Sequence, residues 1–313
     1  MGYLRLLNLP LLFTALGDVV AGYVVVTALP GVVPSPGVMI LLLIASGGLF
    51  GAGAVSRGCF EFENEESLAP EGPLHRGEAT LKGAFILATA FSVLGVLAAM
   101  LVGKATVYLA WALLFTHWLH GGYLREFDVT GSVAVGATRL LNMMMGMSAG
   151  DEFVYSVRGL LPWGSSELLL PVSILLVYAV LVSIIGRLRT EGGTRFTLLA
   201  AWAGILVTLL AAGVFYWSKS FFSVLLLMLV AAAVAVPMLG AVSRLSPRSI
   251  GRVVMVGTLS AALLDASFIF GSGGAGGERW LVTLLAGVFT MALLLPAIVA
   301  WRMAPRESVD GMA

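Results

Sequence analysis

The sequence predicts an all-α, multi-pass membrane protein, and three observations lead to this fold class. Hydrophobic residues make up 59% of the 313 residues, charged residues only 11%, and the mean hydropathy is +1.00. A soluble domain carries roughly 25% charged residues. The apolar residues also gather into runs of about 20, the length that a helix needs to cross the hydrocarbon core of a bilayer. We therefore expect membrane-spanning helices and no sizeable soluble domain.

Ten apolar runs are candidates for spans, so nine or ten transmembrane helices are expected. The runs cover residues 9–33, 36–56, 80–103, 105–120, 130–148, 167–187, 196–217, 219–242, 250–271 and 279–301. The fourth run is short, which is why the count is nine or ten. We interpret 1–313 as a single transmembrane domain with two halves, 1–148 and 149–301, followed by a short tail, 302–313.

The basic residues indicate which helix ends face the cytoplasm. With ten spans and the N-terminus inside, 13 of the 18 Lys and Arg residues lie at cytoplasmic ends, four lie at the opposite ends, and Arg139 falls within a span. Cytoplasmic loops of membrane proteins carry an excess of Lys and Arg. We therefore expect both termini and the loops 57–79, 121–129 and 188–195 on the cytoplasmic side of a membrane, interpreted as a prokaryotic cytoplasmic membrane.

Composition also narrows the functional classes. The net charge is +1 and the basic residues are scattered, so nucleic acid is not an expected partner. Cys59 is the single cysteine, which excludes an intramolecular disulfide and argues against redox chemistry. No Ser–His–Asp or Cys–His arrangement suggests a covalent nucleophile.

Residues 57–77, with the sequence RGCFEFENEESLAPEGPLHRG, contain five of the 17 acidic residues. Glu61 and Glu65 are four residues apart, so on a continuing helix their carboxylates share one face and could converge on one cation. Mg²⁺ is commonly held by one or two carboxylates together with waters and phosphate oxygens. The alternative is an acidic loop that faces the cytosol, and the residues alone leave both interpretations open.

Four stretches, in this order along the chain, carry a resemblance to a known family. They are LRLLNLPLLFTALGDVVAGYVV, GAGAVSRGCFEFENEESLAPEGPLHRGEAT, GATRLLNMMMGMS and GRLRTEGGTR. Together they resemble the first span, the first acidic motif, part of the fifth span and the second acidic motif of the UbiA superfamily of intramembrane prenyltransferases, most closely its EboC-like branch. The resemblance implies a UbiA-like helical bundle around a central cavity.

The resemblance also implies a metal site. Enzymes of this family use the two acidic motifs to hold Mg²⁺ on the diphosphate of a prenyl donor. Carried over position by position, the metal ligands of this chain are Glu61 and Glu65 in the first motif and Glu191 in the second. Mg²⁺ is therefore the expected cofactor.

Both acidic motifs are degenerate. Arg57 and Gly58 stand where the family has Asn and Asp, and Arg189 and Gly193 stand where the second motif has aspartates. Arginine binds phosphate oxygens in a bidentate fork, so guanidinium groups could take over part of the charge neutralisation. The resemblance therefore implies Arg57, Arg189 and Arg125 as diphosphate-binding residues. The alternative for each is a helix-flanking residue that sets topology.

Polar side chains inside the spans need partners, because a charge at a helix centre costs roughly 2.5–3.5 kcal/mol on insertion scales. Asn8, Asp18, Arg139 and Asn142 belong to the stretches that carry the resemblance, which implies that they line an acceptor pocket. The alternative is an interhelical ion pair between Asp18 and Arg139. Asp265 lies outside these stretches and is interpreted as structural.

The resemblance implies a prenyltransferase that moves a prenyl group from a polyprenyl diphosphate to an acceptor within the membrane. Its partners are then the prenyl diphosphate and the surrounding membrane lipids, while the residues name neither the acceptor nor an oligomeric state. The second hypothesis is a non-catalytic protein of the same fold that binds an isoprenoid lipid or assists its transport. The degenerate second motif motivates this alternative.

Overall fold

The computed structural model describes residues 2–29, 32–63, 72–124, 127–149, 166–191, 194–272 and 280–303, and within them it contains helices and no strands. The helices are α1 (Gly2–Leu6), α2 (Leu9–Thr27), α3 (Pro36–Glu63), α4 (Leu81–Val102), α5 (Lys104–Gly122), α6 (Asp128–Met147), α8 (Ser166–Glu191), α9 (Arg195–Tyr216), α10 (Phe221–Ser243), α11 (Pro247–Ser272), α12 (Trp280–Ala292) and α13 (Leu294–Met303). The all-α prediction is confirmed for this part of the chain.

Each apolar run of the sequence coincides with one helix, and the last run is divided between α12 and α13. In the described part of the chain, seven helices are long and apolar enough to cross a membrane, namely α2, α3, α4, α8, α9, α10 and α11. The helices α5 and α6 carry more polar residues, and α12 and α13 are short. A multi-pass membrane bundle is therefore confirmed, and the count of nine or ten spans stays a prediction.

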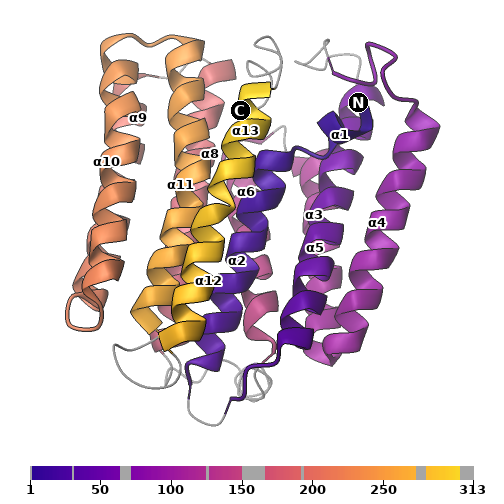
Figure 1. Ribbon diagram of the computed structural model, residues 1–313. Coiled ribbons are helices and arrows are strands. Elements are labelled where there is room, and N and C mark those ends of the chain that lie inside the picture. Colours follow the sequence, from indigo (N-terminus) through magenta and orange to yellow (C-terminus); the bar gives the residue numbers. More distant parts are fainter. Residues whose placement is uncertain are drawn as a thin grey trace.

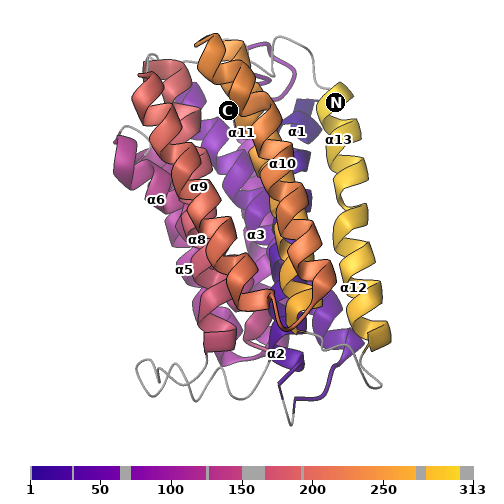
Figure 2. The ribbon, with the colours of Figure 1, turned by 90° about the vertical axis from the view of Figure 1, so that its left-hand side faces the viewer.

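The helices run side by side along one common direction, successive helices from α2 to α12 reverse it, and α13 continues the direction of α12 (Figure 1). Helix α2 is the most central: it packs against α3, α6, α11, α12 and α13. Figure 2 shows α5 and α6 along one side of the bundle and α12 and α13 along the other. The centre of the molecule is therefore built from helices that are far apart in sequence.

One end of the bundle gathers α1, the last turns of α3 and α8, and α13 (Figure 1). We call it the motif end because it carries Arg57, Glu61 and Arg189. The positive-inside pattern places this same end in the cytoplasm, and that orientation stays a prediction. An ion pair between Arg5 Nη1 and Glu78 Oε2, 2.7 Å long, ties α1 to the segment that leads into α4.

The junction between α1 and α2 follows from local sequence. Asn8 precedes α2 with φ 46° and ψ 61°, a left-handed conformation that Asn tolerates better than most residues. Pro10 lies in the first turn of α2, where a missing backbone N–H leaves no helical hydrogen bond unmade. The chain therefore turns at Asn8 before it enters the bundle.

Helices α2 and α6 approach each other to backbone contact. A Cβ atom on Gly22 would overlap the carbonyl oxygen of Met143, and one on Gly146 would overlap that of Val19. Small residues permit this closeness between membrane helices, where packing drives association. The two glycines therefore set the distance at which side chains on α2 and α6 meet.

Replacing Gly146 by Ala should destabilise the bundle, because the added methyl group would force α6 away from Val19 of α2. Overpacking of this kind costs about 1–3 kcal/mol. Thermal unfolding of the purified protein in detergent, followed by circular dichroism, measures the change in Tm.

The matched control is Gly213→Ala on α9, because no atom lies within 4 Å of a Cβ at Gly213. That change should leave Tm unchanged or raise it slightly, since Ala favours a helix over Gly. An equal fall in Tm for both variants would contradict the close approach of α2 and α6.

Candidate functional site

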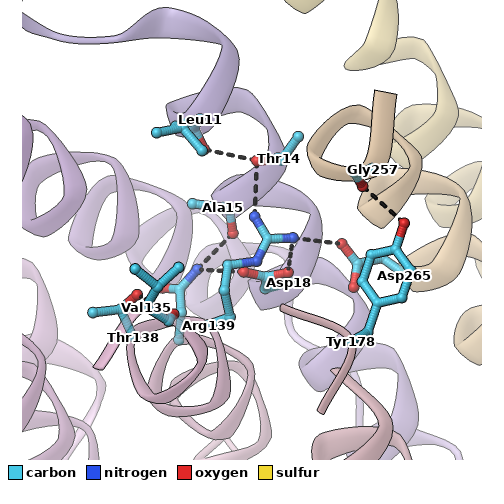
Figure 3. Close-up of polar contacts among 11 residues, drawn as sticks. Leu11, Thr14, Ala15, Asp18, Val135, Thr138, Arg139, Tyr178, Gly257 and Asp265 are labelled. Atoms are coloured by element: carbon cyan, nitrogen blue, oxygen red, sulfur yellow. Dashed lines mark hydrogen bonds and ion pairs between the residues drawn. The ribbon is translucent and has the colours of Figure 1, made fainter. Parts of the chain in front are cut away.

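A cluster of polar side chains is buried at the centre of the bundle (Figure 3). Thr14 and Asp18 project from α2, Arg139 and Asn142 from α6, and Asp265 from α11. Both aspartates are fully buried and Arg139 is only 6% exposed. We call these five residues the core cluster.

An ion pair joins α2 to α6 within the core cluster. Arg139 Nη2 lies 2.7 Å from Asp18 Oδ1, and Arg139 Nη1 donates a hydrogen bond of 2.8 Å to Thr14 Oγ1. The Thr14 hydroxyl in turn donates to the carbonyl of Leu11. The guanidinium group is therefore held on two sides by α2. Of the two interpretations that the sequence left open, the structure contains the interhelical Asp18–Arg139 pair.

Asn142 reinforces the same contact one turn further along α6. Its Nδ2 donates 2.6 Å to the carbonyl oxygen of Ala15 and lies 3.5 Å from Asp18 Oδ2. Asp18 is thus approached by Arg139 at one oxygen and by Asn142 at the other. Asn8, the fourth residue expected near an acceptor, lies ten residues before Asp18, about 15 Å away along the helix axis. It is not part of the core cluster.

Asp265 is the member of the core cluster that sequence reasoning missed as a site residue. Its Oδ2 lies 3.9 Å from Arg139 Nη2, too far for a hydrogen bond, and neither carboxyl oxygen has a donor among the described residues. Gly17 of α2 leaves room for it, because a Cβ there would lie 2.8 Å from Asp265 Oδ2. One signal was available: away from their ends, the spans carry two acids, Asp18 and Asp265, and one base, Arg139, so one acid is left over.

The motif end holds Arg57, Glu61 and Arg189. Arg57 Nε lies 3.8 Å from Glu61 Oε1, an i,i+4 pair in the last turns of α3, with both side chains partly exposed. Arg189 extends along α11, where a Cβ on Gly251 would lie 3.7 Å from its Nη1. The structure therefore places all three at one end of the bundle and pairs Arg57 with Glu61.

Three of the expected site residues cannot be located in the same way. Glu65 and Arg125 lie outside the described residues, and so does the side chain of Glu191. Among the residues that are described, no three His, Cys, Asp or Glu side chains form a group that could hold a metal ion. Glu61 fits as one Mg²⁺ ligand, because this ion needs only one or two carboxylates beside phosphate oxygens and water.

A largely apolar groove of about 560 Å³ lies between α3, α4 and α5. Its lining includes Gly53 and Ser56 of α3, Leu97 of α4 and Phe115 of α5. Leu97 and Phe115 are more than half exposed, so the groove opens to the lipid-facing surface. Its shape and apolar lining suit a hydrocarbon chain.

The part of this groove that Ser56 and Trp118 line reaches the motif end. Ser56 is followed directly by Arg57, and Glu61 lies in the next turn and a half of α3. Trp118, another groove residue, packs its ring against Phe60 with a centroid distance of 6.3 Å. A charged pair and an apolar groove therefore adjoin on one helix.

Replacing Arg139 by Met should destabilise the protein by about 3–5 kcal/mol, because the carboxylate of Asp18 would be left buried without its counter-charge. Asp18→Asn combined with Arg139→Met should cost less than the sum of the two single changes. Thermal unfolding of the four proteins in detergent gives the coupling energy. Additive effects would contradict the Asp18–Arg139 pair.

Comparisons with known proteins were made for sequence and for structure. No protein-family model and no curated protein sequence matches the chain. Solved structures do match. The apo structure of a UbiA homologue from Aeropyrum pernix K1 has a TM-score of 0.61 and 17% identity, and the match covers 86% of this chain and 98% of that chain.

Two further structures lead to the same fold. A digeranylgeranylglyceryl phosphate synthase has a TM-score of 0.59 and 15% identity over 87% of this chain and 97% of that chain. A UbiA homologue from Archaeoglobus fulgidus bound to DMAPP and Mg²⁺ has a TM-score of 0.54 and 14% identity over 100% of both chains. At such identities the likeness establishes the fold: this chain is a membrane bundle with the fold of the UbiA homologues.

Proposed function

We propose that this chain is a Mg²⁺-dependent prenyltransferase that moves a prenyl group from a prenyl diphosphate to an acceptor within the membrane. The observation that carries the proposal is the UbiA fold together with the Arg57–Glu61 pair where α3 leaves the apolar groove. A prenyl diphosphate has the matching character, with an anionic head on an apolar chain. A structure with the same fold was solved with DMAPP and Mg²⁺ bound.

The donor's diphosphate would bind at the motif end. Glu61, with Glu65 and Glu191, would ligate Mg²⁺, which when bound supplies positive charge to the phosphate oxygens. Arg57 and Arg189, with Arg125, would donate hydrogen bonds to those oxygens. Neutralising the leaving group lets the allylic C–O bond break, with its electron pair leaving on the diphosphate. A nucleophilic acceptor then bonds to the allylic carbon and loses a proton.

The donor's hydrocarbon chain would lie in the groove between α3, α4 and α5. Of the groove residues, Ser56 and Trp118 are nearer to the motif end, and Leu97 and Met100 would contact the hydrocarbon chain further from the diphosphate. The groove opens to lipid, so a long chain enters from the membrane without crossing water. This arrangement separates the charged head from the apolar tail, as the two halves of the ligand require.

For the acceptor we propose the surroundings of the core cluster. Asn142 Oδ1 is buried and lacks a hydrogen-bond partner among the described residues, so it can accept a hydrogen bond. Arg139 and Asp18 hold α6 and α2 in register beside it. Asn8, at the turn into α2, would stand at the entrance on the motif end.

One observation favours a non-catalytic alternative. Arg57 is paired with Glu61, and Arg189 stands where the resemblance implies an aspartate, so cationic side chains could hold a diphosphate without metal. The protein would then bind an isoprenoid lipid and release no diphosphate. Binding that is unaffected by a chelator, with no product formed, would support this alternative.

Glu61→Gln should lower the Mg²⁺-dependent release of diphosphate from a geranyl or geranylgeranyl diphosphate donor. A neutral amide binds Mg²⁺ less strongly, so we expect a loss of roughly 10–100-fold or more, together with a higher Mg²⁺ requirement. Purified protein in lipid nanodiscs with a mixed pool of aromatic and glyceryl acceptors provides the assay.

The matched control is Glu167→Gln. Glu167 is a partly exposed carboxylate at the opposite end of the bundle, where Lys219 Nζ lies 2.8 Å from its Oε1. Its loss should leave diphosphate release and Mg²⁺ dependence unchanged. Full activity of Glu61→Gln would show that Glu61 is not a ligand of the metal ion.

Filling the groove should shorten the donor that the protein accepts. Val96→Trp places an indole in the groove, so KM for a geranylgeranyl donor should rise while KM for a dimethylallyl donor stays constant. Leu101→Trp is the control, because Leu101 is 73% exposed on the same helix and lies outside the groove. If KM for both donors stayed at the wild-type value in both variants, the donor's hydrocarbon chain would lie outside this groove.

A further inference from the structure

The core cluster is not balanced in charge. Arg139 supplies one positive charge, and Asp18 and Asp265 would supply two negative charges if both were ionised. All three side chains lie inside spans, with exposed fractions of 6% for Arg139 and 0% for both aspartates. An uncompensated charge is costly at this depth, so something must neutralise the second carboxyl group.

The two carboxyl groups have different surroundings. Asp18 has the guanidinium of Arg139 at 2.7 Å and the amide of Asn142 at 3.5 Å. Asp265 has only the longer ion pair to Arg139, at 3.9 Å, and both Asp265 oxygens lack a hydrogen-bond donor among the described residues. Asp18 is therefore the natural ionised partner of Arg139, and Asp265 is the acid left over.

Asp18 Oδ1 and Asp265 Oδ2 approach the same nitrogen, Arg139 Nη2, at 2.7 Å and 3.9 Å, so the two carboxyl groups face each other across one guanidinium group. Two carboxylates cannot hydrogen-bond to each other, because an ionised carboxylate only accepts. A single proton removes the conflict, because a protonated carboxyl group donates to a carboxylate. The same proton brings the core cluster to neutrality.

Among the described residues, Arg139 is the charged side chain that pairs with Asp265, and α8 carries its charged residues in its first turn and its last two turns. On α8, the Tyr178 hydroxyl already donates 2.9 Å to the carbonyl oxygen of Gly257 on α11. The helices α10 and α12, which also pack against α11, have no ionisable residue within their bounds. On α12, Thr290 contributes only a buried hydroxyl that has no partner among the described residues. A metal cation is disfavoured because it would lie beside the guanidinium of Arg139.

We propose that the centre of the bundle is a proton-binding site, in which one proton is held by Asp265 and donated in a hydrogen bond to Asp18. Asp18 remains ionised and pairs with Arg139. The site couples three helices, since α11 is joined to α2 by the proton and α2 to α6 by the ion pair. The proton-binding site does not depend on the proposed prenyl transfer. Loss of its proton would leave a second, uncompensated carboxylate charge buried in the bundle.

Infrared spectroscopy of the full chain in nanodiscs tests the site directly. At neutral pH the wild-type protein should show the C=O stretching band of a buried carboxylic acid, shifted to lower frequency in D₂O. Asp265→Asn should lose this band and Asp265→Glu should keep one, displaced in frequency. Absence of the band in the wild-type protein, or its persistence in Asp265→Asn, would overturn the proposal.

The pH dependence of Tm gives a second readout. If the folded protein holds a proton that the unfolded chain releases, the unfolded state binds fewer protons and stability falls as pH rises. Asp265→Asn, an uncharged mimic of the protonated acid, should abolish this fall between mildly acidic and neutral pH. Glu167→Gln should retain it. If Tm fell with rising pH as steeply in Asp265→Asn as in the wild-type protein, the proton-binding site would be overturned, whatever the enzymatic assays show.

Discussion

The ion pair between Asp18 and Arg139 is the constraint on which the rest of the structure depends. A guanidinium and a carboxylate inside a membrane bundle must meet each other, because lipid offers no other partner. They meet at 2.7 Å only because α2 and α6 approach to backbone contact at Gly22 and Gly146. The glycines and the charges are thus two parts of one requirement: the small residues bring the helices together, and the ion pair fixes their register.

The polar groups of this protein occur at two depths with different tasks. At the motif end, Arg57 and Glu61 are partly exposed, so they can exchange partners with an incoming ligand at little cost. At the centre, Arg139 and the two aspartates are buried and satisfy mainly one another. The groove between α3, α4 and α5 lies beside the first group. This division suits the proposed binding of an anionic head group at the motif end, beside a rigid core.

Some of these features could be predicted from local sequence. The apolar runs gave helices at the expected places, because hydrocarbon forces the backbone to satisfy its own hydrogen bonds. The spacing of Arg57 and Glu61 also places them on one helix face. The metal role of Glu61 with Glu65 and Glu191, the diphosphate role of Arg125 and the EboC-like branch stay predictions. The interpretation of Asp265 as structural was made without its neighbours on α2 and α6, which local sequence does not show, and it stays a prediction.

The sequence by itself determined the helices, their approximate ends and the membrane environment, since these depend on composition and on contacts within a few residues. Only the tertiary structure decided which helix faces which. Helices that are apolar all round carry no amphipathic stripe to indicate their rotation, so the meeting of Asp265 with Asp18 and Arg139, 247 and 126 positions away in sequence, could not be inferred. The groove likewise exists only through the spacing of three helices. Contacts between distant helices depend on rotation and register, and both are fixed only when the helices come together in the bundle.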